Sequence, residues 1–257
     1  MAGETAPGRR IVTLSGNDAL TFLQGLVSND VLALKKGKGI VWTALLTPQG
    51  KYLADFFVVN TGDTLLLDLP ETLADATLRR LTMYRLRADV QMVATELPVS
   101  RGLGPAPPQA LNDPRHPDLG WRVYGVTGGE PVIDWEAIRV AHVIPETGIE
   151  LLPDGSYLPE TGFERLHGVD FRKGCYVGQE VTARMKHKTE LRKGLARVQI
   201  TGAVPVGTPI LSDGKEVGTL YTQSGGHGIA YLRFDRVTPK MTAGGAKVSI
   251  ASQDIDP

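Results

Sequence analysis

The amino-acid composition changes after Leu191, and this change limits the possible folds more than any other feature of the sequence. Beyond it, glycine and β-branched residues dominate and no helical period is found. Strands are therefore predicted at 195–200, 208–211, 216–222, 228–233 and 246–250. Asp213-Gly214 lies between two of them and is a strong signal for a two-residue hairpin. We predict a small β domain over residues 191–257.

The first 190 residues mix helices with strands. Strands are predicted at 11–14, 40–47, 52–60, 64–69, 88–94 and 121–126, and helices at 18–26, 71–84, 134–143 and 178–188. The segment 98–120 is rich in proline and glycine, so we expect a loop there. An α+β domain over residues 1–190, followed by the β domain over 191–257, suits a chain of 257 residues.

The overall charge narrows the class of partner. The chain has 28 Lys and Arg residues and 28 Asp and Glu residues, so its net charge is zero and no basic footprint for duplex nucleic acid is expected. A single cysteine allows no internal disulfide and fits a reducing compartment. The N-terminal segment is polar and no run of about 18 apolar residues occurs, so we expect neither a signal peptide nor a membrane span. The cytoplasm is the predicted location.

The one cysteine, Cys175, lies in the octapeptide KGCYVGQE, residues 173–180. A thiol reacts as its thiolate, and two neighbouring cations, Arg172 and Lys173, favour that anion. The N-terminus of the helix predicted after Gly178 favours it too. We therefore predict a reactive thiol. The alternative is a small packing residue, because free cysteines are often buried.

The octapeptide, with Thr182-Ala183-Arg184 after it, closely resembles the signature of the YgfZ-type proteins, which are folate-binding-like relatives of the glycine-cleavage aminomethyltransferase. This family includes the mitochondrial factor that helps mature [4Fe-4S] proteins. The resemblance covers nearly the whole chain. Its weaker segments, in order, are 14–19, 22–26, 28–30, 46–51, 84–87, Arg139 with 144–146, and 167–171.

The resemblance implies a folate-binding, aminomethyltransferase-like α+β domain with a small C-terminal antiparallel β-barrel. It also implies tetrahydrofolate as the cofactor and Cys175 as the reactive residue of an accessory factor. Such a factor helps to assemble or repair iron–sulfur clusters on client enzymes, including tRNA-modifying ones. The ligand-binding residues that it suggests are Asn29, Asp30, Asp55, Tyr84, Arg87, Glu160, Gln179, Glu180 and Arg184. The expected partners are iron–sulfur clients or assembly factors and a folate-like small molecule, with no nucleic acid and no membrane.

Two departures from the aminomethyltransferase pattern count against a one-carbon transferase, which is the alternative function. One aspartate, Asp55, stands where the transferases carry a pair, and Ala141 stands where they carry the glutamate that reads the pterin ring. Losing that carboxylate weakens recognition of the pterin's donor edge, although Glu160 or Asp170 can act as a substitute acceptor. A non-enzymatic factor is therefore expected more than an enzyme. A third possibility is a binding module in which Cys175 is incidental.

Several of these residues also have ordinary structural explanations. Asp55 can be a plain strand residue, and Gln179 and Glu180 suit the first turn of a helix. Tyr84 and Arg87 can cover the core with their stems. A basic run follows Cys175 and is either a solvated face or a docking strip for an acidic group; it comprises Arg184, Lys186, His187, Lys188, Arg192 and Lys193. None of the histidines has metal-site spacing, so no metal is expected.

Overall fold

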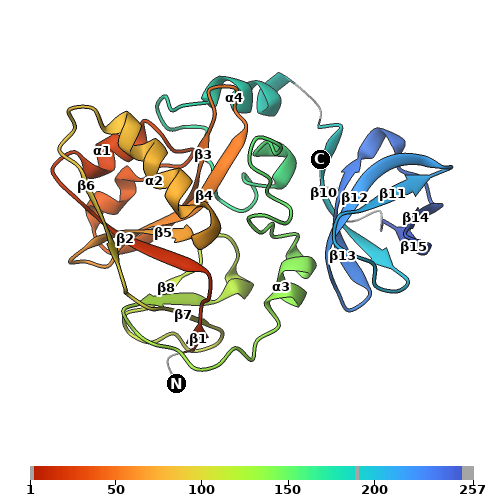
Figure 1. The fold of residues 1–257 in the computed structure, drawn as a ribbon, viewed down its shortest axis with the longest axis horizontal. Helices are drawn as coiled ribbons and strands as arrows, with labels where there is room; N and C mark the ends of the chain where they lie inside the picture. Colours follow the sequence, from red (N-terminus) through yellow and green to blue (C-terminus); the bar gives the residue numbers. More distant parts are fainter. Residues whose placement is uncertain (1–2, 189–190, 251–257) are drawn as a thin grey trace. The chain divides into compact units, whose positions relative to one another are not determined.

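The computed structural model describes residues 3–188 and 191–250 (Figure 1). The chain divides into two compact units, each built from two separate stretches. The first unit comprises Met1–Ile133 and Glu164–Glu180. The second comprises Asp134–Phe163 and Val181–Pro257. No helix among the described residues has the length and apolar character needed to cross a membrane.

The first unit contains a five-stranded antiparallel sheet with the order β3-β4-β5-β2-β6. Its strands are β2 (Arg9–Ser15), β3 (Gly39–Leu46), β4 (Tyr52–Asn60), β5 (Leu65–Pro70) and β6 (Gln91–Thr95). Two helices, α1 (Ala19–Gln24) and α2 (Glu71–Arg85), and the 3₁₀ helix η1 (Leu32–Lys36) accompany it. These elements lie close to their predicted positions, because β3, β4 and β5 are mostly apolar runs and residues 71–84 have a helical period.

The main core of this unit lies between the helices and one face of that sheet. Strand residues such as Val12, Phe56 and Leu67 pack there against Leu23 of α1 and Leu81 of α2. Successive residues of a strand point to opposite faces, so Phe57 points away from this core. Phe57 therefore has different neighbours, which lie on the other face of the sheet.

A second sheet in the same unit has the order β1-β7-β9-β8. Its strands are β1 (Glu4–Thr5), β7 (Val99–Gly102), β8 (Leu111–Asn112) and β9 (Trp121–Tyr124), and the 3₁₀ helix η2 (Pro117–Leu119) lies between the last two. The prediction of a loop over 98–120 is therefore wrong in part. These strands are short and pair with residues far away in sequence, such as Glu4 with Arg101, so the local proline and glycine content concealed them.

Buried charges connect the two sheets. Asp68 of β5 is fully buried and accepts hydrogen bonds from Arg9 Nε (2.6 Å), Arg122 Nη2 (2.9 Å) and the hydroxyl of Tyr124 (2.8 Å). The guanidinium of Arg122 lies 4.5 Å from the centre of the Phe57 ring. Burial by itself raises the pKa of Asp68, but Arg9 and Arg122 outweigh it and hold that pKa below its usual value.

Asp113 extends this network. It pairs with Arg115 at 2.8 Å and lies 3.8 Å from Arg122. Burial alone would raise the pKa of Asp113, but the two arginines have the larger effect and lower it. The guanidinium of Arg115 also lies over the rings of Trp42 and Phe57. The network is internal to the first unit and gives its second sheet a fixed position against β4 and β5.

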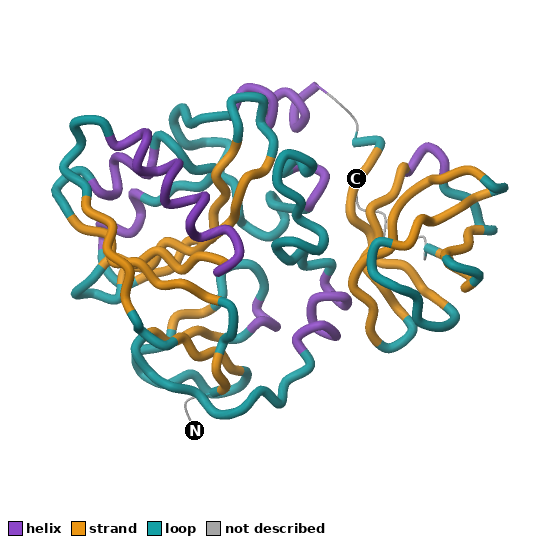
Figure 2. Tube along the Cα trace, in the orientation of Figure 1, coloured by secondary structure: helices purple, strands orange, loops and turns teal. Residues whose placement is uncertain are grey.

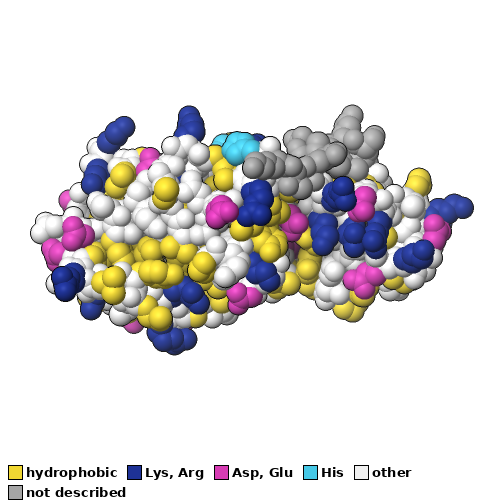
Figure 3. All heavy atoms as spheres, turned by 90° about the horizontal axis from the view of Figure 1, so that it is seen from above, with side chains coloured by type: hydrophobic (Ala, Val, Ile, Leu, Met, Phe, Trp, Pro, Cys, Tyr) yellow, Lys and Arg dark blue, Asp and Glu magenta, His cyan; other side chains and the backbone are white. Residues whose placement is uncertain are grey.

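The second unit contains a closed antiparallel barrel with the order β10-β13-β12-β11-β14-β15. Its strands are β10 (Lys193–Ile200), β11 (Thr208–Ser212), β12 (Lys215–Ser224), β13 (His227–Arg233), β14 (Met241–Ala243) and β15 (Ala246–Ser249), with the 3₁₀ helix η4 (Phe234–Arg236) after β13. Figure 2 shows strands joined by loops in this region, and charged side chains of both signs cover the barrel on the face drawn in Figure 3.

The predicted hairpin joins β11 to β12. Ser212 pairs with Lys215, and Asp213 and Gly214 between them both have positive φ, at 49° and 76°. This is the backbone that a two-residue hairpin turn requires and that Asp-Gly favours. The predicted β-barrel is confirmed, although β14 was missed because it has only three residues.

Two helices and a 3₁₀ helix precede the barrel: α3 (Trp135–His142), η3 (Pro159–Thr161) and α4 (Gln179–Lys188). Within the second unit, Arg139 of α3 donates to Glu150 at 2.5 Å and to the Thr222 hydroxyl of β12 at 3.3 Å. Glu150 also accepts from the Thr222 backbone N–H at 3.2 Å. Arg139 therefore attaches α3 to the barrel.

Candidate functional site

Cys175 lies exposed on a loop of the first unit. We call residues 168–178 the cysteine loop. Gly174 beside the cysteine is also exposed, and no atom lies near the position that a Cβ there would take. The thiol is therefore accessible to another molecule and is not a packing residue, and its predicted reactivity stays a prediction.

Lys173 ties the middle of the cysteine loop to the end of α1. Its side chain is buried, with 9% exposure, and Nζ donates to the backbone carbonyls of Gln24 (2.8 Å), Val27 (2.5 Å) and Asn29 (2.9 Å). The last carbonyls of a helix have no partner within the helix, so a cation suits this position. All three donors of the ammonium group are used. Lys173 therefore anchors the loop two residues before the thiol.

Ser28 and Asn29 hold the beginning of the loop. The Ser28 hydroxyl donates to the Gly168 carbonyl at 2.7 Å, and the Asp170 backbone N–H donates to the Ser28 carbonyl at 3.2 Å. The Asn29 amide donates to the carbonyls of His167 (2.6 Å) and Trp42 (2.8 Å). Asn29, predicted to contact a ligand, thus joins the loop to β3.

The end of the loop packs closely against two turns. The Val177 backbone N–H donates to the Gly25 carbonyl at 3.3 Å. Gly178 has φ +83°, and a Cβ there would lie 2.5 Å from the carbonyl oxygen of Thr47. A glycine is required at this position both by the backbone angle and by the space. The helix α4 begins at the next residue, Gln179, as predicted.

The two cations next to the thiol have different environments. Burial lowers the pKa of Lys173 to about 8, against the effects of Asp30 and Asp170, which raise it. The side chain of Arg172 is 93% exposed and lies 3.4 Å from Asp170. The sequence analysis treated Arg172 and Lys173 as cations that favour the Cys175 thiolate. The Lys173 ammonium group, however, donates all three of its hydrogen bonds to backbone carbonyls. Arg172 is the more exposed charge.

Two further residues predicted to bind a ligand have partners inside the first unit. Asp30 accepts from the Gln24 side-chain amide and from the Leu32 backbone N–H, both at 3.0 Å. Asp55 is 7% exposed and accepts from Trp42 Nε1 at 2.8 Å and from the Tyr52 hydroxyl at 2.7 Å. Asp30 lies beside the cysteine loop, whereas Asp55 joins side chains of β3 and β4.

The remaining predicted residues lie on other elements. Tyr84 is at the C-terminal end of α2 and Arg87 follows it, and both are exposed. Gln179 and Glu180 form the first turn of α4, and Arg184 is exposed further along it. Each of these side chains is at least partly open to solvent.

Glu160 belongs to the second unit. It accepts a hydrogen bond of 2.6 Å from the hydroxyl of Tyr231 on β13. Burial raises the pKa of Tyr231, and the bond to Glu160 raises it further. This carboxylate is therefore engaged with the barrel.

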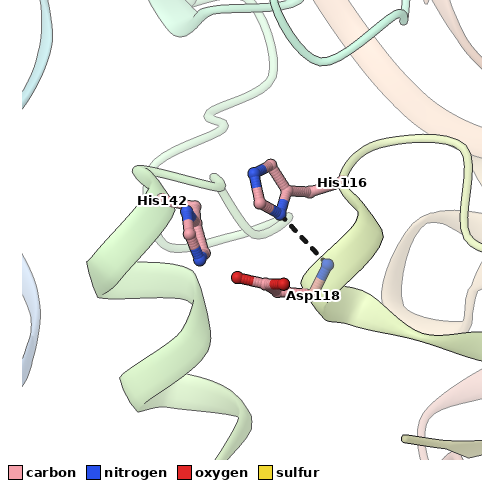
Figure 4. A group of neighbouring side chains, drawn as sticks. All are labelled: His116, Asp118 and His142. Atoms are coloured by element: carbon pink, nitrogen blue, oxygen red, sulfur yellow. Dashed lines mark hydrogen bonds between the residues drawn. The ribbon is translucent and has the colours of Figure 1, made fainter. Parts of the chain in front are cut away.

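The His116 ring also has a local structural role. Its Nδ1 accepts a hydrogen bond of 3.2 Å from the Asp118 backbone N–H and so caps η2 (Figure 4).

Sequence reasoning missed the roles of the buried charged residues. Asp68, Arg122 and Glu150 were not singled out, yet each is almost completely buried. One signal was present: Asp68 stands between leucines in a strand that is otherwise apolar. A charged residue in such a run is rarely buried without a partner, so it indicated an internal ion pair.

Comparisons with known proteins agree with this architecture. The family model described as "CAF17, C-terminal beta-barrel domain" matches residues 192–257, the barrel and the residues around it. The chain is 32% identical over 220 residues to the mitochondrial iron–sulfur cluster assembly factor IBA57 homolog of Mycosarcoma maydis, covering 73% of this chain and 54% of that protein. It is 28% identical over 293 residues to the human factor IBA57, covering 95% and 82%. The chain spans about half the length of its fungal relatives.

The fold has a match among solved structures. The glycine cleavage system aminomethyltransferase T from Bartonella henselae superimposes with a TM-score of 0.75, covering 98% of this chain and 86% of that one, at 12% identity. This likeness concerns the fold alone, and it confirms the predicted fold class. The chain is thus a homologue of iron–sulfur cluster assembly factors, built on the aminomethyltransferase fold with a C-terminal β-barrel.

Proposed function

We propose that this chain is an accessory factor that helps to assemble or repair iron–sulfur clusters on client enzymes, and that Cys175 supplies the sulfur contact. The observation that carries the proposal is an exposed thiol on a loop whose beginning, middle and end are all fixed by hydrogen bonds. A loop held in this way presents the sulfur at a constant position to a docking partner. The relatives are named as iron–sulfur cluster assembly factors, and we take the iron–sulfur cluster as the substrate from those names.

One sulfur limits what the chain can do with a cluster. An iron–sulfur cluster needs about four protein ligands, and this chain has one cysteine. The cluster is therefore a transient substrate, and most of its ligands come from the partner. The thiolate can occupy one iron position during transfer, because a thiolate is a good ligand for iron and an exposed site lets it dissociate.

We also propose the narrower assignment to the YgfZ-type proteins, with tRNA-modifying enzymes among the clients. The octapeptide at 173–180 supports it. The predicted cytoplasmic location stays a prediction, since the names of the relatives place those proteins in mitochondria.

We also propose that the chain binds tetrahydrofolate, and the hydrogen bonds of the predicted residues limit which side chains can hold it. The side chains of Asn29, Asp30, Asp55 and Glu160 are already engaged inside the protein and offer no ready acceptor for the pterin. Glu180 is exposed, so its carboxylate is the predicted acceptor that a folate can reach from solvent. Isothermal titration of the full chain with tetrahydrofolate tests this. Glu180→Gln is expected to weaken binding, and Asp55→Asn to leave it unchanged.

The rival function is a tetrahydrofolate-dependent aminomethyl transferase. Both carboxylate oxygens of Asp55, the one aspartate left of the transferase pair, accept hydrogen bonds from Trp42 and Tyr52, which counts against a role in proton transfer. An assay of aminomethyl transfer to tetrahydrofolate separates the two functions. Turnover at an ordinary enzymatic rate would show that the chain is a transferase and would refute the proposed assembly role.

The main test is complementation of a strain that lacks the gene, with the activity of a [4Fe-4S] enzyme as the readout. Cys175→Ser removes the thiolate and keeps the size of the side chain, so that enzyme's activity should fall to the level of the deletion strain. Thr242→Ser, which introduces the same residue at an exposed barrel position, is the matched control and should restore activity fully. Full restoration by Cys175→Ser at normal protein level would show that the thiol is incidental.

A further inference from the structure

The C-terminal end of α2 carries exposed apolar side chains. The buried residues of this helix are Ala74, Thr77 and Leu81. Met83 and Leu86 point the other way and are 77% and 89% exposed, and Tyr84 beside them is 37% exposed. On the face of the molecule drawn in Figure 3, hydrophobic side chains of the first unit lie among Lys and Arg side chains. We call Arg79, Met83, Tyr84, Leu86 and Arg87 the α2 end patch.

The backbone of Leu86 is unusual. It follows the last residue of α2 with φ 44° and ψ −104°, a conformation that a bulky residue rarely adopts. Glycine is the usual residue where a helix ends with positive φ, because it has no Cβ. Here a leucine takes this position, and its side chain is 89% exposed. Strain of this kind is found at functional surfaces more often than elsewhere.

Arginines predominate around the patch. Arg79, Arg80, Arg85 and Arg87 lie between Ala76 and Ala88, and the flanking carboxylates of Asp75 and Asp89 accept hydrogen bonds from Arg10 and Asn17. Arg79 and Arg87 are exposed and form no ion pair with the residues that the structure describes. Arginine, tyrosine and methionine are enriched at protein interfaces, whereas lysine and the acidic residues are depleted there.

We propose that the α2 end patch docks a protein partner whose contact surface is acidic and carries apolar side chains. The arginines provide charge complementarity, which orients the partner, and Met83 and Leu86 provide apolar area, which holds it. A single aromatic ring in the patch does not suit the stacking of nucleic-acid bases. The surface does not include Cys175, so the proposal goes beyond the proposed function of the cysteine loop.

The test uses the full chain and a defined probe. The probe is a fluorescent amphipathic peptide of about 18 residues with leucines along one helical face and glutamates elsewhere. Binding is measured by fluorescence anisotropy. Peptides with lysine for glutamate, or alanine for leucine, should bind at least about tenfold more weakly. Affinity for the acidic peptide should fall as NaCl rises from about 50 to about 300 mM.

Variants of Leu86 separate docking from a purely structural role. Leu86→Ala and Leu86→Gly should both weaken peptide binding about tenfold, since each removes the apolar contact. Leu86→Gly should at the same time leave the melting temperature unchanged or raise it, because glycine relieves the backbone angle. Val132→Ala, at another exposed apolar residue of the same unit, is the control and should change binding by less than about twofold.

Charge reversal tests the second half of the proposal. Arg79→Glu should weaken binding and flatten its dependence on salt, whereas Lys36→Glu, at an exposed lysine of η1, should do neither. Cys175→Ser should bind the peptide like the unmodified chain, so failure of this test leaves the cysteine proposal intact. Equal losses in Val132→Ala and Leu86→Ala would overturn the assignment. Binding to anionic phosphatidylserine vesicles but not to the peptide, or self-association through Leu86 in sedimentation, would overturn it as well.

Discussion

Replacing Lys173 by methionine removes three hydrogen-bond donors from the carbonyls of Gln24, Val27 and Asn29 while keeping a side chain of similar length. A hydrogen bond from a charged donor contributes about 1.5–3 kcal/mol, which gives roughly 4.5–9 kcal/mol for three. Burial of the ammonium group and ordering of a long side chain offset part of this, the second by about 2 kcal/mol. We therefore expect Lys173→Met to favour local opening of the cysteine loop by about 2–4 kcal/mol.

Amide hydrogen exchange measures this opening directly. The backbone N–H groups of Asp170 and Val177 donate to Ser28 and Gly25 and report on both sides of the anchor. Since about 1.4 kcal/mol is a factor of ten, their exchange should speed up by about 30-fold to 700-fold in Lys173→Met. Arg172→Met is the matched control, because that side chain is 93% exposed and its ion pair with Asp170 contributes less than about 1 kcal/mol.

One result would refute the argument. If Asp170 and Val177 in Lys173→Met exchanged within about threefold of the unmodified chain, packing and not the lysine would hold the loop. Faster exchange in Arg172→Met than in Lys173→Met would also contradict the assignment, since it would make the exposed cation the anchor.

Two other predictions concern stability. Asp68 and Asp113 have pKa values below the usual range, so the unfolded chain binds more protons, and the free energy of unfolding should decrease as the pH falls below about 4. Urea titrations across this range measure how steeply the free energy of unfolding depends on pH. Asp68→Asn should reduce this dependence to the part that Asp113 contributes, and an undiminished dependence would contradict the assignment to Asp68. Gly178→Ala should lower the free energy of unfolding by about 1–3 kcal/mol, because the backbone angle and the Thr47 carbonyl both oppose a Cβ. Gly174→Ala has open space around it and should be nearly neutral in thermal melting; similar losses in both variants would argue against steric conflict at Gly178.

Local sequence patterns were sufficient for most of the fold. The strand at 52–60 is a mostly apolar run, the helix at 71–84 has an apolar stripe, and the Asp213-Gly214 turn has the backbone that its residues favour. The strands within 98–120 could not be predicted in this way. Their pairings are not those of tight hairpins, since Glu4 pairs with Arg101 and Val99 with Tyr124. Gly102, which allows close packing against Trp121, also made the segment resemble a loop.

The site was predicted less completely than the fold. The octapeptide indicated a reactive thiol before a helix, and the structure has an exposed Cys175 on the loop that leads into α4. The anchoring role of Lys173 was not evident, because a sequence does not show that three carbonyls from residues 24–29 converge on one ammonium group. The same is true of Asp55, whose partners Trp42 and Tyr52 lie on two paired strands.

The discontinuous first unit has a consequence for biosynthesis. The carbonyls that receive Lys173 leave the ribosome long before it does, since as many as 149 positions separate donor from acceptor. During synthesis, the residues whose carbonyls receive Lys173 are therefore made first. Asp134–Phe163, which belong to the second unit, follow, and the cysteine loop is completed last. A chain arrested before residue 164 would lack Cys175, the one thiol of the sequence, so incomplete translation products should not react with thiol-alkylating reagents.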